Sequence, residues 1–362
     1  QAKYFNAFNQ IPQMGPARFN KLSAHFKTLS EAWRAPAAEL ARAGLDAPTA
    51  EIIVCKRPQI DPDAEMEKLE KFGVRLITRD SENYPRLLKE IYNPPAALYV
   101  RGKLLANLDE YAIAVVGTRK ISNYGRQVTP LIVADLAKAG ITIVSGLAYG
   151  VDELAHRTTL TARGRTIAVL GSGIDNASIY PASNRALALQ IIESGGAVIS
   201  ELPLGSLPLK MHFPFRNRII AGSTLGTLVV EADLESGSLI TARLALEQNR
   251  QVFAVPGSIF NHVAAGPNNL IKIGAKAITC AADILDELNL KTAVSELAAR
   301  TVIADTPDEE KLLKLLSKEP AHINKLIKES GLAAGEVSAT LTMMEIKGKV
   351  KNLGAMQYVI SR

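Results

Sequence analysis

The chain has 362 residues, of which 47% are hydrophobic and 22% are charged, the composition of a globular protein with two or three domains. Its two cysteines, Cys55 and Cys280, lie far apart with no histidine or cysteine at ligand spacing, which argues against a disulfide framework or a structural zinc site and predicts a reducing, cytoplasmic environment. No apolar run approaches the length of a membrane span, and the net charge of +6 weakly favours a polyanionic partner.

Residues 1–70 predict a small helical domain. Phe19, Leu22 and Phe26 recur at helical spacing after the turn at 14–16, and Ser30 is predicted to cap the helix that follows. A turn that opens a helix in this way is typical of helix-hairpin-helix and SAM-like modules, but the paired glycines of a strong phosphate-binding signal are missing from this sequence. The sequence therefore favours a structural packing role for this domain.

Residues 71–290 predict an α/β domain, which follows a connector rich in proline and aspartate at 57–63. Short β-branched segments alternate with segments of helical length, as in an extended Rossmann-like fold with a doubly wound, mostly parallel sheet. Pro130 is predicted to kink its helix or to lie in the first turn. The predicted strands are 75–78, 97–100, 112–116, 142–144, 166–170, 197–200, 227–230, 252–255 and 277–279, and the predicted helices include 127–139, 153–162, 184–194, 238–248 and 284–288.

Residues 291–308 are predicted to form a linker and residues 309–362 a winged-helix-like domain. This last part contains predicted helices at 309–317, 323–330 and 334–347 and a short hairpin around Gly348 and Gly354. The third helix of such a fold can enter a DNA groove. Small winged helices also serve as dimer or protein-interaction modules, and the sequence leaves both roles open.

Three turns that contain glycine follow predicted strands of the central domain. In an open α/β sheet the carboxyl ends of the strands line one crevice, where backbone amides at helix starts can hold an anion. The turns predict a phosphate-binding crevice lined by Gly117, Thr118, Arg119, Ser145, Gly146 and Gly171. None of the turns completes a dinucleotide fingerprint or a Walker motif, so no cofactor is predicted.

The strongest signal is the segment from Lys210 to Gly222, which combines cations with aromatic rings. Cations can contact phosphates while a ring stacks on a base. The sequence predicts that Lys210, Phe213, Arg216, Asn217 and Arg218 bind a nucleic acid, with the last three at the N-terminal end of a buried helix.

Three acidic residues near this segment allow other interpretations. An arginine of the segment can instead pair with Glu201, Glu231 or Asp233 inside the fold. Glu231 and Asp233 are also candidates for a catalytic carboxylate pair, but we expect them to hold a turn or to pair with arginine. The sequence thus predicts no catalytic residue and no metal ligand.

These motifs resemble the DNA-processing protein A (DprA/Smf) family over about residues 80 to 280. The resemblance implies an extended Rossmann fold, a homodimer without catalytic activity, binding of single-stranded DNA, and help in loading the RecA recombinase during natural transformation. The family's DNA pocket combines a Gly-x-Arg turn with a lysine and a phenylalanine three residues apart. These features fall on Gly117–Arg119, Lys210 and Phe213, while Arg216 and Arg218 are added from charge and position. The resemblance is carried by segments that include 84–88, 94–102, 116–119, 145–152, 168–173, 213–222, 236–242, 253–257 and 265–271.

The alternative is a nucleotide-processing enzyme of the phosphoribohydrolase type on the same fold. Gly226, Thr227 and Glu231 weakly match the glycine-rich loop of that group. However, the residues 223–225 interrupt the glycines, and no acid and base pair is well placed.

Overall fold

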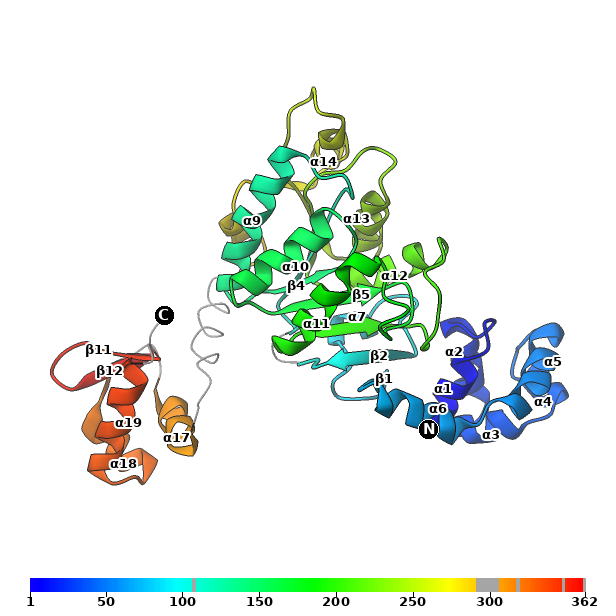
Figure 1. Ribbon diagram of the computed structural model, residues 1–362, viewed down its shortest axis with the longest axis horizontal. Coiled ribbons are helices and arrows are strands. Elements are labelled where there is room, and N and C mark those ends of the chain that lie inside the picture. Colours follow the sequence, from blue (N-terminus) through cyan, green and yellow to red (C-terminus); the bar gives the residue numbers. More distant parts are fainter. Residues whose placement is uncertain (106–108, 291–305, 317–319, 347–348, 361–362) are drawn as a thin grey trace. The chain divides into compact units, whose positions relative to one another are not determined.

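The computed structural model describes residues 1–105, 109–290, 306–316, 320–346 and 349–360 (Figure 1). The chain packs into two compact units, Gln1–Ile284 and Leu285–Arg362. No helix within the described ranges has the length and apolar character needed to cross a membrane. The expected fold class is confirmed, whereas the division into four domains stays a prediction.

The first unit begins with a helical region built around aromatic residues. Phe5 stacks on Phe19 with ring centroids 4.2 Å apart, and Phe8 meets Trp33 edge to face at 4.8 Å. The structure corrects the expected cap, because Oγ1 of Thr28, rather than Ser30, accepts the hydrogen bond at the start of α3. The helices are α1 (Ala2–Asn9), α2 (Pro16–His25), α3 (Leu29–Arg34), α4 (Ala37–Arg42), α5 (Ala47–Lys56), η1 (Arg57–Gln59) and α6 (Pro62–Lys71).

The predicted connector at 57–63 is largely helical. Arg57–Gln59 forms a 3-10 turn, and the Asp61 side chain accepts hydrogen bonds from the amides of Asp63 and Ala64 at the start of α6. Proline favours the first helical turn because it lacks the N–H that would be unsatisfied there. The Asp-Pro pair therefore begins a helix instead of a loop.

A nine-stranded sheet forms the centre of the first unit, in the order β1-β2-β6-β5-β4-β3-β7-β8-β9. β2 pairs antiparallel with β1 and β6, and the other neighbours are parallel. All nine predicted strands are present, with ends shifted by at most two residues. They are β1 (Arg75–Thr78), β2 (Ala97–Gly102), β3 (Ala112–Val116), β4 (Thr142–Ser145), β5 (Thr166–Leu170), β6 (Ala197–Ser200), β7 (Gly226–Val229), β8 (Gln251–Ala254) and β9 (Lys276–Ala277).

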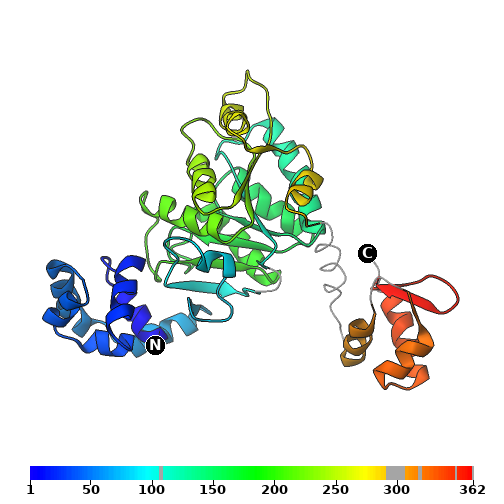
Figure 2. The ribbon, with the colours of Figure 1, turned by 180° about the vertical axis from the view of Figure 1, so that it is seen from behind.

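Helices cover both faces of the sheet (Figures 1 and 2). Along β5, Ile167 and Val169 belong to one buried cluster, while Ala168 and Leu170 belong to another. Because side chains alternate along a strand, β5 has a core on each face, as in a doubly wound sheet. The helices are α7 (Arg86–Lys89), α9 (Asn123–Lys138), α10 (Val151–Thr161), η2 (Ala182–Asn184), α11 (Arg185–Glu193), α12 (His212–Gly222), α13 (Gly237–Glu247), η3 (His262–Ala264), α14 (Ala265–Lys272) and α15 (Ala281–Glu287).

Two helix starts decide where residues of interest lie. α9 begins at Asn123 after the Ser122 cap, earlier than the predicted range 127–139, so Pro130 lies inside the helix and not in its first turn. α12 begins at His212, which places Pro214 in the first turn and Arg216, Asn217 and Arg218 in the middle of the helix. The expectation that these three residues open the helix is therefore wrong.

In its described residues, the second unit contains three helices and a three-stranded sheet of order β10-β12-β11. Thr306 caps α17, so the helix begins within the predicted linker. The other linker residues, 291–305, and Lys347 and Gly348 lie outside the described residues. The arrangement is that of a winged helix, as predicted. Its elements are α17 (Pro307–Leu315), β10 (Ala321–His322), α18 (Ile323–Ser330), α19 (Ala334–Ile346), β11 (Val350–Asn352) and β12 (Gln357–Ile360).

Candidate nucleic-acid interface

A cleft of about 380 Å³ opens where the chain reverses its direction across the sheet, between β3 and β7. Open α/β sheets bind ligands at this switch point, beyond the carboxyl ends of the strands. The cleft combines the turn after β3, one face of α12 and the start of α13. Its lining includes Gly117, Thr118, Arg119, Asp152, Phe213, Arg216, Asn217, Asp233, Glu235, Ser236 and Ser238.

Phe213 lies among positive charges in and beside this cleft. The Arg119 guanidinium is 5.6 Å from the centre of the Phe213 ring, and the Arg216 guanidinium is 5.9 Å away. Lys210, three residues before Phe213, is exposed. In the described part of the chain neither Arg119 nor Lys210 forms an ion pair. These two cations are therefore available to an anionic ligand.

The turn after β3 holds its shape through contacts with Glu231. A Cβ on Gly117 would lie 2.5 Å from Val151 and 2.9 Å from the carbonyl oxygen of Glu231, so only glycine fits this close packing. The amide of Thr118 donates to the same carbonyl at 2.6 Å. This hydrogen bond occupies the Thr118 amide, whereas free amides were expected at the turn. The Arg119 side chain is exposed to solvent.

Ser145 and Gly146 lie inside the fold, which differs from the expectation that they line the crevice. The buried Ser145 hydroxyl donates to the carbonyl oxygen of Val115 at 2.6 Å. The Gly146 amide donates to the Asp152 carboxylate at 3.1 Å, and a Cβ on Gly146 would lie 2.1 Å from Nη1 of Arg216. The role of Gly146 is therefore to leave room for an arginine.

Arg216 is buried beneath the cleft. Its Nη1 donates to the carbonyl oxygens of Gly146, at 2.6 Å, and of Val169. Burial lowers the pKa of Arg216 to about 10, although the nearby Asp152 opposes this shift. Asn217 lies on the cleft side and donates to the Gly237 carbonyl at 3.3 Å, and Gly171 packs against the Phe213 ring.

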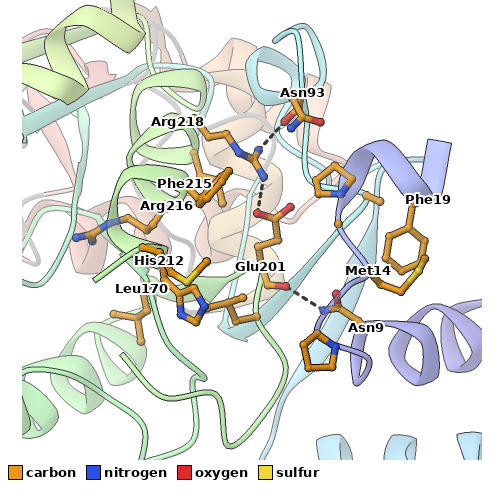
Figure 3. Close-up of a pocket in the computed structure, with 18 of the residues that line it drawn as sticks. Asn9, Met14, Phe19, Asn93, Leu170, Glu201, His212, Phe215, Arg216 and Arg218 are labelled. Carbon is orange, nitrogen blue, oxygen red and sulfur yellow. Dashed lines mark hydrogen bonds and ion pairs between the residues drawn. The ribbon is translucent and has the colours of Figure 1, made fainter. Parts of the chain in front are cut away.

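Arg218 pairs with an acid inside the fold, the alternative that the sequence had left open. Its guanidinium contacts the Glu201 carboxylate and also donates to the carbonyl oxygen of Asn93 (Figure 3). Burial raises the pKa of Glu201, whereas the charge of Arg218 lowers it. Glu231 likewise has a structural partner, because its carboxylate accepts hydrogen bonds from the amide and hydroxyl of Ser122.

A second cavity, of about 250 Å³, lies on the other side of α12, against the helical region (Figure 3). Its walls include Met14, Phe19, Glu201 and Phe215. Sequence reasoning missed this cavity because its walls come from segments that are far apart in the chain. No group of histidine, cysteine and acidic residues suited to a metal ion occurs among the residues described.

Comparisons with known proteins agree with this architecture. The family of the DNA recombination-mediator protein A matches residues 75–289, and the DprA winged helix domain matches residues 296–356. Protein Smf of Synechocystis is 36% identical, over 98% of this chain and 98% of its own. DNA processing protein DprA of Bacillus subtilis is 45% identical over 60% of this chain and 72% of its own.

Solved structures give the same relationship. DNA processing protein A from Streptococcus pneumoniae matches with a TM-score of 0.69 and 35% identity, covering 79% of this chain and 98% of that one. A structure that describes the single-stranded DNA binding mode of DNA processing protein A from Helicobacter pylori matches with a TM-score of 0.53 and 32% identity, covering 60% of this chain and 96% of that one. The chain therefore belongs to the DprA/Smf family of DNA-processing, recombination-mediator proteins.

Proposed function

We propose that this protein binds single-stranded DNA in the switch-point cleft and does so without catalysis. The observation that carries the proposal is the Phe213 ring beneath Arg119 and close to Lys210, with neither cation held by a described carboxylate. Cations that follow the phosphates, combined with a ring that stacks on a base, are the usual means of binding a single strand. The Helicobacter pylori relative, whose single-stranded DNA binding mode has been described, supports the same ligand.

We assign direct DNA contacts to Arg119, Lys210, Phe213 and Asn217. Gly117 and Thr118 position the first of these, and Gly171 supports the Phe213 ring. The remaining predicted residues are buried and act as a scaffold. Ser145, Gly146 and Arg216 lie beneath the cleft, and Arg218 lies at the second cavity on the other side of α12.

Replacing both exposed cations tests this assignment. For single strands, the slope of log K against log salt changes by about 0.7 for each phosphate contact. The Arg119→Ala/Lys210→Ala variant is therefore expected to bind oligonucleotides of any sequence more weakly, with a salt slope smaller by about 1.4. Lys272→Ala, which removes an exposed lysine of α14 outside the cleft, is the matched control. Wild-type affinity in the double variant would rule out this site.

The family resemblance extends the proposal to partners. We propose that a homodimer in the cytoplasm passes the bound strand to a RecA recombinase. Recombinase assembly on DNA coated with single-strand-binding protein should then accelerate when this protein is added. The double cation variant should not produce this acceleration.

A nucleotide-processing activity is the second candidate, because Asp233 and Glu235 line the same cleft as Arg119. Against it, the Glu231 carboxylate is occupied by Ser122, so Glu231 and Asp233 do not form a free carboxylate pair. Incubation with nucleoside monophosphates distinguishes the two functions: sustained release of free base would favour the enzyme.

A further inference from the structure

The cavity beside α12 contains buried polar atoms among its mostly apolar walls. In the described chain, Oε1 of Glu201 and Oε1 of Gln13 are buried without a hydrogen-bond partner, as is Nε of Arg218. All three residues line the cavity. Buried polar atoms without partners are uncommon in native proteins and each one calls for an explanation, such as a ligand that completes its hydrogen bonds.

The walls of the cavity suit a flat ring. Figure 3 shows His212 and Phe215 on the α12 side and Met14 and Phe19 on the side of the helical region, with Glu201 between them. The volume of about 250 Å³ is below the roughly 300–1,000 Å³ of sites for drug-sized ligands. The cavity is therefore better matched to one planar ring system than to a larger cofactor.

The cavity adjoins the proposed DNA site at the start of α12. Gly171 lines the cavity and also contacts the Phe213 ring. Lys210 immediately precedes Met211, another residue of the cavity, whose side chain is 63% exposed. A strand that follows Lys210 and Phe213 would thus pass the mouth of the cavity.

We propose that the cavity receives one nucleobase of the bound strand, a base that carries an exocyclic amino group. The inference rests on the proposed function, since it requires the strand to lie along α12. The amino group would donate to Oε1 of Glu201 and of Gln13, and an adjacent ring nitrogen would accept from Nε of Arg218. Adenine and cytosine present this pair of groups, and thymine lacks the amino group.

The ion pair between Glu201 and Arg218 opposes an alternative occupant, because the carboxylate already neutralises the Arg218 guanidinium in the cavity. A phosphate in the cavity would meet the carboxylate, whereas a base leaves its phosphate outside, near Lys210. Stacking on Phe215, which is 59% exposed, would hold the base at the entrance.

Oligo-dC and oligo-dT of equal length provide the test, because both are pyrimidine strands and only cytosine has the amino group. We expect wild-type protein to bind oligo-dC about fivefold more tightly, the factor that corresponds to a net hydrogen bond of roughly 1 kcal/mol. Gln13→Leu, which keeps the size of the side chain and removes the acceptor, should lower this preference toward one. Phe215→Ala should weaken binding of oligo-dC by at least about fivefold through lost stacking.

Two controls separate this inference from the proposed function. Leu246→Ala removes an exposed apolar side chain of α13 that does not line the cavity, and it should leave the preference intact. Arg119→Ala/Lys210→Ala should weaken both oligonucleotides equally and keep the preference. Equal binding of oligo-dC and oligo-dT by wild-type protein, with normal salt dependence, would overturn the base pocket alone. The base pocket would also be overturned if Gln13→Leu and Phe215→Ala both kept the preference for oligo-dC. If wild-type protein bound neither oligonucleotide, both proposals would be overturned.

Discussion

The basic side chains of the α12 segment divide between the interior and the surface. Lys210 is exposed, but Arg216 and Arg218 are buried, where a guanidinium loses its hydration. Each buried arginine instead donates hydrogen bonds to fixed partners, Arg216 to two carbonyl oxygens and Arg218 to Glu201 and a carbonyl oxygen. The two buried arginines thus hold α12 in place, and the exposed cations remain free for a ligand.

Arg218→Met tests the role of the ion pair between Arg218 and Glu201. Removing one member leaves Glu201 as an unpaired buried charge, a change that typically costs about 3–5 kcal/mol of stability at neutral pH. Without Arg218, burial should raise the pKa of Glu201 further above its ordinary value of 4.5. A raised pKa means that the folded state binds more protons than the unfolded state, so stability falls as pH rises between the two values. In urea unfolding, the stability that the variant loses relative to wild type should therefore become smaller as the pH falls toward 4.5.

A loss of stability in Arg218→Met that does not depend on pH would mean that packing, and not charge, accounts for the effect. Arg243→Met is the control, because Arg243 is exposed and pairs only with the exposed Glu247. Exposed pairs contribute about 0–1 kcal/mol.

Which of these residues face inward could not be read from the sequence. The cluster of Lys210, Phe213, Arg216 and Arg218 is local in the chain and was predicted. The partners of the arginines come from Gly146, Val169, Glu201 and Asn93, which only the folded sheet brings together. Local sequence therefore identifies the segment that forms the candidate site. Tertiary contacts decide which of its cations are available to a ligand.

At the scale of elements, strands and most helices follow the predicted pattern because apolar β-branched runs and helical spacing reflect burial directly. The start of α12 was missed because Arg216, Asn217 and Arg218 were expected to open the helix, whereas it begins at His212 and tolerates Pro214 in its first turn. The turn after β3 was located by Gly117. Its hydrogen bonds to Glu231, more than a hundred residues later, were beyond local reasoning.

Ser122→Ala tests how firmly this turn is held. The Ser122 hydroxyl caps α9 by accepting from the Gly125 amide and also contacts the Glu231 carboxylate. Loss of a cap typically costs about 1 kcal/mol, and the unsatisfied carboxylate adds about 1–3 kcal/mol. Thr28→Ala removes an exposed cap that contacts no buried acid, so it should cost only the roughly 1 kcal/mol of a lost cap. Equal losses for both variants in urea titrations would show that Glu231 does not depend on Ser122.

At the scale of the molecule, the helical region belongs to the same compact unit as the sheet. The Tyr99 hydroxyl of β2 donates to Asn6 at 2.7 Å, and the Asn9 side chain donates to Tyr99 and to the carbonyl oxygen of Glu201. Ala97 of β2 also belongs to the aromatic core of the helical region. Helical spacing and the connector at 57–63 predicted a separate domain here. The polar contacts with β2 and Glu201 leave no periodic signal in the sequence, so they were not predicted.

Two truncations test this integration. Fragment 1–290 keeps the whole first unit, so we expect it to melt in one transition and to bind single-stranded DNA with the affinity of the full chain. Fragment 71–290 loses the partners of Tyr99, a side chain that is fully buried in the intact protein, and exposes the apolar surface around Ala97. We expect fragment 71–290 to unfold at a lower temperature and a lower urea concentration than fragment 1–290. If calorimetry instead gave both fragments the same melting temperature, the helical region would be an independent domain. The cavity beside α12 would then have a movable wall, and no base pocket could depend on it.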